Sequence, residues 1–206
     1  MSSTSVPLAA TGASNKRDAI LQAALQLFAE RGYHGTAMPE LAQRAGVGTG
    51  TIYRYFDSKE VLVNAVFQQS KRLLRDHLVK DIDLAQPART LFHTLWQSLI
   101  QFARAFPQDF RFLELQDHVP YLDTDSRNIE LEVLAPIWAW CVSARRAGTS
   151  RDMPAEALMA LVWGAFVGLL KAEHTGHIKL DDSILAAAEE ACWAAFSASQ
   201  TATMPQ

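Results

Sequence analysis

The chain has 206 residues, which is enough for one or two domains with a substantial hydrophobic core. Hydrophobic residues make up 49% and charged residues 20%, so the composition is that of a soluble globular protein rather than a disordered or fibrous one. The formal net charge is −3, so any contact with nucleic acid must come from a local patch and not from bulk positive charge.

Residues 1–13 are rich in Ser, Thr and Ala and predict a flexible tail. They lack the basic and apolar segments of a signal peptide. Apolar residues at helical spacing then predict a first helix over residues 15–31, with Ser14 as its N-cap. Gly32 stands where a helix commonly ends in a left-handed conformation.

Two short helices follow, over residues 38–44 and 49–55, and a tight turn that contains Gly46 joins them. A helix-turn-helix needs a first helix that packs, a glycine-containing turn and a second helix that is free to enter the major groove. Ile52 would anchor the second helix, and Phe56 would be buried just after it. We expect Asp57 to form a capping box with Glu60 and to open a fourth helix that reaches residue 80.

Five further helices are predicted over residues 87–106, 108–119, 126–147, 154–175 and 182–199. Pro136 falls inside the third of these and should disturb it, and Asp181 should cap the last. Strand signals are nearly absent, so the predicted fold is all-α with nine helices. The longest uncharged apolar run, residues 157–170, is shorter than the roughly 20 residues that a membrane span needs, so we expect no membrane association.

Cys141 and Cys192 each lie in an apolar run, and their spacing matches no disulfide framework. We expect two buried thiols and a reducing, cytoplasmic location.

The outward positions of the predicted second helix of the helix-turn-helix suit duplex DNA. Small residues at its start allow backbone N–H groups to approach phosphate. Threonine and tyrosine hydroxyls and an arginine can reach phosphates or base edges, and a lysine in the next helix can reach a phosphate. The tyrosines could instead be core residues, and the arginine could be only a solvated charge. These positions are Gly48, Thr49, Gly50, Thr51, Tyr53, Arg54, Tyr55 and Lys59.

The segment resembles the head of the TetR/AcrR family of bacterial transcriptional regulators. The resemblance is carried by AILQAALQLFAERGYHGTAMPELAQRAGVGTGTIYRYFDSKEVL, and above all by AGVGTGTIYRYFDSKE, Ala45–Glu60. It implies a three-helix DNA-binding domain over residues 14–60 and a ligand-binding and dimerisation domain over residues 61–206. By the same resemblance, the DNA contacts fall on Thr36, Gly48, Thr49, Gly50, Thr51, Tyr53, Arg54, Tyr55 and Lys59.

The chain departs from the family pattern at Gly48 and Thr49, where the family commonly has Ser and then Lys. Glycine offers no side-chain cap, and threonine removes a positive charge. We therefore expect weaker phosphate anchoring or a different base preference, with the fold unaffected. The spacing of Gly46, Gly48 and Gly50 superficially matches a nucleotide-binding loop, but such a loop follows a buried strand and a helix precedes it here.

In this family the C-terminal helices form the dimer. The last two predicted helices support this, because they carry two glycines four residues apart and a stripe of small apolar residues. Glycine inside a helix is tolerated where another backbone approaches closely. The alternative is that these helices pack only within one chain. A four-helix dimer interface is expected to use Leu161, Gly164, Ala165, Gly168, Leu185, Ala188, Cys192 and Phe196.

Aromatic residues crowd the middle of the chain, and most of them must be core residues. Pockets between bundle helices take their walls from such residues, with a few polar groups that orient the ligand. A metal site of His93, Glu114 and His118 is conceivable, but the spacing matches no known ligand pattern, so we expect no metal and no cofactor. The candidate effector pocket consists of Phe92, His93, Trp96, Phe110, Glu114, Asp117, His118, Trp138 and Phe166.

The predicted function is that of a homodimeric repressor that binds a palindromic operator and is released by a small apolar or aromatic effector. No serine–histidine–acid spacing, phosphate loop or paired-carboxylate motif indicates an enzyme. A protein-interaction module without DNA binding, and an activator in place of a repressor, are the other readings that the sequence leaves open.

Overall fold

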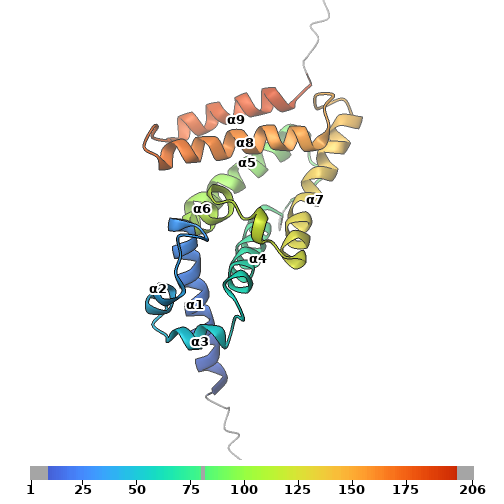
Figure 1. Ribbon diagram of the computed structural model, residues 1–206. Coiled ribbons are helices and arrows are strands. Elements are labelled where there is room, and N and C mark those ends of the chain that lie inside the picture. Colours follow the sequence, from blue (N-terminus) through green and yellow to red (C-terminus); the bar gives the residue numbers. More distant parts are fainter. Residues whose placement is uncertain (1–8, 80–81, 199–206) are drawn as a thin grey trace, which may run out of the picture. The chain divides into compact units, whose positions relative to one another are not determined.

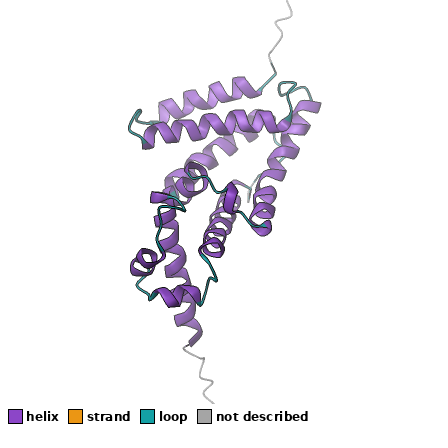
Figure 2. Cartoon of the chain, in the orientation of Figure 1, coloured by secondary structure: helices purple, strands orange, loops and turns teal. Residues whose placement is uncertain are grey.

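The computed structural model of the protein describes residues 9–79 and 82–198, although the side chains of residues 9–14 and of Val119 are not described. Helices joined by loops make up these residues, and the only strand-like feature in them is an isolated bridge between Ser150 and Ser197 (Figure 2). The predicted all-α class is confirmed. The helices, labelled in Figure 1, are α1 (Ala9–Arg31), α2 (Met38–Arg44), α3 (Thr49–Tyr53), α4 (Lys59–Leu78), α5 (Ala88–Ala105), α6 (Pro107–Leu115), the 3₁₀ helix η1 (Val119–Tyr121), α7 (Thr124–Arg146), α8 (Ala155–His174) and α9 (Asp182–Phe196).

Several predicted helix ends are displaced. Helix α1 begins at Ala9, so Ser14 lies inside it and does not cap it, and only residues 1–8 of the predicted tail lie outside the described residues. Helix α3 ends at Tyr53. Helix α4 ends at Leu78 and α9 at Phe196, and the predicted ends at residues 80 and 199 lie outside the described residues.

Ser58, not Asp57, caps α4. Its Oγ accepts a hydrogen bond from the backbone N–H of Val61 at 3.2 Å, and its carbonyl accepts one from Leu62 at 3.1 Å. Serine and aspartate both cap helices well, and the observed cap lies one residue after the predicted one. At α9 the predicted cap is confirmed, since Asp181 Oδ1 accepts from the backbone N–H of Ile184 at 2.9 Å.

The chain divides into two compact units, and α4 and α7 contribute to each of them. Unit 1 comprises residues 1–73 and 106–129, and unit 2 comprises residues 74–105 and 130–206. The boundary predicted between residues 60 and 61 falls within the first turn of α4. The compact unit that contains the helix-turn-helix is therefore larger than residues 14–60, because α6 packs along α1.

The core of unit 1 joins α1 to α6 and positions the helix-turn-helix. Phe28 and Phe112 are both fully buried, and their ring centroids are 6.2 Å apart. Gly32, with a φ of +70°, ends α1 in the predicted left-handed conformation. A Cβ there would lie 2.8 Å from Gln116 Oε1. Glycine therefore also makes room for the side chain of Gln116, which follows α6, against the end of α1.

The core of unit 2 is formed by α5, α7, α8 and α9. Trp140 stacks on Phe196 with a centroid distance of 4.9 Å, and Phe166 packs edge-on against Trp96 at 5.3 Å. Helices α8 and α9 lie side by side as a helical hairpin (Figure 1). The bridge between Ser150 and Ser197 joins the segments just outside this hairpin.

Candidate functional site

The turn between α2 and α3 is built as the sequence predicts. Gly46 has a φ of +65°, its N–H donates to Gln43 O at 3.1 Å, and the N–H of Val47 donates to Ala42 O at 3.0 Å. These two bonds form a Schellman motif, which satisfies the last carbonyls of α2 and reverses the chain within a few residues. The turn therefore sets the angle at which α3 leaves α2.

Helix α3 is anchored from one side only. Ile52 is fully buried, and Phe56, just after the helix, is 3% exposed. Gly48 is the N-cap residue in an extended conformation, and it makes no side-chain capping bond, as its lack of a side chain requires. The opposite side of α3 stays on the surface of unit 1.

The exposed side of α3 presents Tyr53 and Arg54. Tyr53 is 47% exposed, and no hydrogen bond or ring contact joins its side chain to a residue that the structure describes. Arg54 is exposed and forms no ion pair with any residue that the structure describes. Among the other predicted contacts in and next to α3, Thr49, Thr51 and Tyr55 are half-buried, and Gly48 and Gly50 are exposed.

Gly50 is not required by the packing of the chain. An added Cβ at this position would meet no described atom within 4 Å, and the backbone there has no positive φ. At Gly48 the nearest atom to an added Cβ is Thr51 Oγ1 at 3.9 Å. Neither glycine relieves a clash with a described atom.

A basic residue that the sequence interpretation missed lies beside α3. The guanidinium carbon of Arg17 is 5.4 Å from the ring centroid of Phe56, which brings the first half of α1 close to the segment just after α3. Lys16 is exposed next to it in the chain. Its signal in the sequence is the pair of basic residues, Lys16 and Arg17, just before the apolar stripe of the first helix.

Thr36 and Lys59 are turned into unit 1. Thr36 is 2% exposed, and its hydroxyl donates to Gly32 O at 2.9 Å, so that hydroxyl is not available to DNA in this structure. Lys59 Nζ donates to Thr36 O at 2.5 Å and lies 4.3 Å from the ring centroid of Tyr33. Burial lowers the pKa of Lys59, although nearby Glu60 opposes the change. Lys59 therefore ties α4 to the loop after α1.

Tyr33 braces the same junction. Its hydroxyl donates to Glu60 Oε1 at 2.8 Å, and its ring stacks on Tyr121 at 4.0 Å between centroids. Burial, together with the hydrogen bond to Glu60, raises the pKa of Tyr33 to about 12. The bond from Tyr33 in turn lowers the pKa of Glu60. Tyr121 also places its hydroxyl 2.6 Å from His34 Nε2.

Asn64 fixes α4 to the segment between η1 and α7. Its Nδ2 donates to the carbonyl of Tyr121 at 2.7 Å and to that of Glu60 at 2.9 Å. Its Oδ1 accepts from the backbone N–H of Asp123 at 2.9 Å and from Ser126 Oγ at 2.7 Å. A buried amide with four partners holds its surroundings in one arrangement. The sequence offered no signal for it, because the partners are far away along the chain.

The structure divides the predicted pocket residues between the two units. Phe92, Trp96 and Phe166 are buried in unit 2 and contact one another through their rings. Trp96 Nε1 is buried, and no described residue accepts a hydrogen bond from it. Trp138 is 44% exposed on the outer side of α7 and does not line this cluster.

The other predicted pocket residues have structural contacts. In unit 1, Phe110 is buried, Glu114 lies 3.8 Å from Lys71 Nζ, and buried His118 binds the carbonyl of Phe112 through Nε2. Asp117 is exposed.

In unit 2, His93 lies on the surface and reaches back to a buried carboxylate. Its Nδ1 is 2.9 Å from Glu189 Oε1, to which Arg89 also donates at 2.6 Å. Burial acts to raise the pKa of Glu189, but the bonds from Arg89 and His93 outweigh it and lower that pKa. This contact joins α5 to α9.

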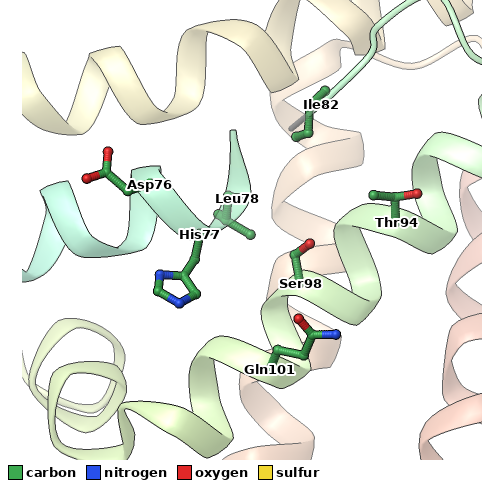
Figure 3. Close-up of a pocket in the computed structure, with 7 residues that line it drawn as sticks. All are labelled: Asp76, His77, Leu78, Ile82, Thr94, Ser98 and Gln101. Atoms are coloured by element: carbon green, nitrogen blue, oxygen red, sulfur yellow. The ribbon is translucent and has the colours of Figure 1, made fainter. Parts of the chain in front are cut away.

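A pocket that the sequence did not predict lies between the end of α4 and α5. Its volume is about 380 Å³, within the range of small-molecule sites. Figure 3 shows the His77 ring pointing toward α5, where it meets Phe102 at 5.9 Å between centroids. Most residues that line the pocket are polar. The lining consists of Asp76, His77, Leu78, Ile82, Thr94, Ser98 and Gln101.

The predicted dimer residues fall into an exposed set and a buried set. On α8, Leu161, Gly164, Ala165 and Gly168 are exposed. On α9, Leu185, Ala188, Cys192 and Phe196 face into their own chain, where α9 packs on α5. The side of α9 that remains exposed is the opposite one, with Ile184, Ala187, Ala191 and Ala194.

Within residues 9–79 and 82–198, no three His, Cys, Asp or Glu side chains come together in a group that could hold a metal ion. Both cysteines are buried as free thiols, as predicted. Burial raises the pKa of the Cys141 thiol to about 11 and also raises that of Cys192, so neither is poised as a nucleophile.

Two family descriptions match successive parts of the chain. Residues 20–66 match the bacterial regulatory proteins of the tetR family. Residues 67–198, more than half of the chain, match the tetracyclin repressor-like C-terminal domain.

Individual relatives agree. An HTH-type transcriptional regulator of Mycobacterium tuberculosis is 41% identical over 83 residues, which are 40% of this chain and only 41% of that protein. One from Haemophilus influenzae is 25% identical over 177 residues, or 85% of this chain and 92% of that protein. A solved TetR-family structure from Vibrio parahaemolyticus has 31% identity and a TM-score of 0.70, and the match covers 88% of this chain and 98% of that one.

Proposed function

The chain belongs to the TetR family of bacterial regulatory proteins, and on that premise we propose that it is a repressor that binds a palindromic operator as a homodimer. Its family membership makes it a helix-turn-helix transcriptional regulator and not an enzyme. We also place it in the cytoplasm, where its operator DNA would be.

The exposed side of α3 carries the proposal. Tyr53 and Arg54 have no internal role that explains their position, and both can bind the DNA backbone or a base edge. Gly50 leaves the backbone bare on the same helix. Arg17, in the first half of α1, adds a second positive charge near the end of α3. Since Thr36 and Lys59 bond to each other, we assign them to positioning α3 and α4.

Dimerisation is proposed through the exposed sides of α8 and α9. A Cβ added at Gly164 or Gly168 would meet no described atom within 4 Å, so the packing of the described residues does not require these glycines. By length and composition α8 could cross a membrane, and little of it is buried. A second copy packed on α8 explains both its apolar surface and its glycines, because small residues let two helices approach closely.

We propose that a small apolar or aromatic effector releases the operator. The rings of Phe92, Trp96 and Phe166 form the candidate wall in unit 2. Leaving the buried indole N–H of Trp96 without an acceptor costs about 1–3 kcal/mol, and an effector with an oxygen acceptor would remove that cost. The polar pocket at the end of α4 is the second candidate, because its volume suits a small molecule.

DNA binding is tested by comparing the wild type with the Tyr53→Ala, Arg54→Ala double variant on the upstream region of the gene at one fixed salt concentration. We expect the affinity of the variant to fall by roughly 100-fold, since each good contact contributes about 1–3 kcal/mol. Ser143→Ala, at an exposed position on α7, is the control and should bind as the wild type does. Full affinity in the double variant would overturn the assignment of these contacts.

A further inference from the structure

Helix α7 carries apolar side chains on two opposite sides. Its inner side, with Val133, Trp140, Cys141 and Ala144, is buried in unit 2. On its outer side, the residues at positions i, i+3, i+4, i+7, i+8 and i+11, which share one side of a helix, are all apolar. We call this the outer stripe; its residues are Leu131, Leu134, Ala135, Trp138, Ala139 and Val142.

The large members of the outer stripe are strongly exposed. Leu131 is 64% exposed, Trp138 44% and Leu134 40%. A helix on the surface of a soluble protein normally has one apolar side, and one that is apolar all round is covered. The stripe is exposed from Leu131 to Ala139, over more than two turns, and ends at half-buried Val142. An apolar surface of this kind is typical of a contact surface.

Charged residues bound the outer stripe at both ends. Arg127 lies one turn before Leu131, and Arg145 lies just beyond Val142, where it pairs with Asp152 at 2.8 Å. Glu130 and Glu132 flank the first leucine but point to either side of the stripe, because they are 100° away from it around the helix. The stripe thus has an apolar centre and a charged rim, which is the usual composition of a protein contact.

Trp138 connects the outer stripe to α8. Its Nε1 donates to Glu156 Oε1 at 2.7 Å, in the first turn of α8. Ala160 and Gly164 follow Glu156 at four-residue intervals on the exposed side of the same helix. The outer stripe and the side of α8 that we assign to the dimer therefore meet at this hydrogen bond.

The exposed sides of α8 and α9 are poor in large side chains. Between the two helices, only Leu161 and Ile184 are large apolar residues with substantial exposure. A stable interface buries about 800 Å² on each partner, and its binding energy is concentrated in a few large residues, with tryptophan enriched among them. The outer stripe would supply a tryptophan and two leucines to such an interface.

We propose that the outer stripe of α7 packs against a second copy of this chain and extends the dimer contact beyond α8 and α9. The inference rests on the proposed dimer. In a two-fold dimer both copies use the same stripe. One substitution in the sequence therefore changes two side chains in the interface, one from each copy.

Sedimentation of the full chain over a range of concentrations tests this. The Leu131→Glu, Leu134→Glu variant should raise the dimer dissociation constant by roughly 100-fold or more, because charges would be buried in an apolar contact. Ser143→Glu, exposed on α7 but off the stripe, should change it by less than about threefold. Leu131→Ser is the milder variant and should raise the constant by roughly tenfold, with helicity unchanged by circular dichroism.

The outcomes separate the two proposals. A wild type that stays monomeric up to about 100 μM would overturn the dimer and this extension together. A wild-type dimer that Gly164→Leu dissociates but the α7 variants leave intact would overturn only the extension. The extension would also be wrong if the stripe variants keep the wild-type dimer affinity, and the wild type and Ser143→Glu sediment with vesicles of phosphatidylglycerol and phosphatidylethanolamine while the stripe variants do not. The stripe would then be a lipid-binding surface.

Discussion

Replacing Gly164 and Gly168 together with alanine separates the stability of one chain from the association of two. Glycine in a helix interior costs about 1 kcal/mol relative to alanine, and no described atom lies within 4 Å of either added Cβ. The double variant of an isolated chain should therefore be more stable by up to about 2 kcal/mol. For a chain of this size, that corresponds to an increase in Tm of roughly 4–8 °C.

Association should change in the opposite direction. A dimer that uses this side of α8 would receive two extra methyl groups from each copy, or four in all. Overpacking a close contact costs about 1–3 kcal/mol, and about 3 kcal/mol would raise the dimer dissociation constant by roughly 100-fold. Thermal unfolding below the dissociation constant gives the first quantity, and sedimentation equilibrium gives the second.

Gly50→Ala is the matched control for the glycine variants. It is also a glycine-to-alanine change in a helix with open space around the new Cβ, but it lies in unit 1. It should leave the dimer dissociation constant unchanged. If the Gly164→Ala, Gly168→Ala variant is more stable and associates as tightly as the wild type, no second backbone approaches α8, and this side of α8 is not part of the dimer contact.

Three further predictions concern unit 1. Gly50→Ala should weaken DNA binding by roughly tenfold without loss of Tm, because the methyl group keeps a phosphate away from the backbone; unchanged binding in a filter or anisotropy assay would contradict this. The carboxyl group of Asp109 accepts a hydrogen bond from Ser70 Oγ at 2.6 Å, and burial raises its pKa. The stabilisation that the protonated carboxyl group contributes is therefore present below pH 3.8 and is lost as the pH rises. Asp109→Asn should therefore be more stable than the wild type in urea at pH 7, with the two midpoints converging toward pH 4, and a less stable variant at pH 7 would show that the charge is favourable. The pKa of Tyr33 is raised to about 12, so the wild type should lose stability between pH 10 and 12, and Tyr33→Phe should lose less; an equally steep loss would exclude the Tyr33 hydroxyl as the cause.

Helix ends were predictable where glycine marks them. Gly32, Gly46, Gly148 and Gly176 all follow helices with positive φ, because only glycine adopts that conformation without strain. Helix starts were less predictable. Ser58 and Asp57 are both good caps and adjacent in the chain, and only the three-dimensional position of Val61 decides between them.

The periodicity of a helix reveals a stripe but not what covers it. The stripe of α9 that includes Leu185 and Phe196 was recognised, yet it packs on α5 within the chain and leaves the opposite side exposed. The same limit applies to Trp138. It was expected to line the effector pocket, but it lies on the exposed, outer side of α7. Sequence spacing gives the side of a helix, and tertiary packing decides which side is inward.

The candidate DNA surface was the most predictable part, because a local motif carries it. Residues 46–56 fold on short-range contacts, so the turn, the anchor and the outward side of α3 follow from spacing alone. Thr36 and Lys59 were harder to assign, since their roles depend on a bond between residues 23 positions apart. Arg17 was missed because Phe56, which it covers, is even farther along the chain.

Hydroxyl-radical footprinting on the upstream region of the gene distinguishes a dimeric DNA-binding regulator from other readings of this chain. We expect two protected half-sites of inverted sequence, roughly 34–36 Å apart, that are lost together in the Tyr53→Ala, Arg54→Ala variant. Protection that is uniform along the duplex and insensitive to that variant would contradict it.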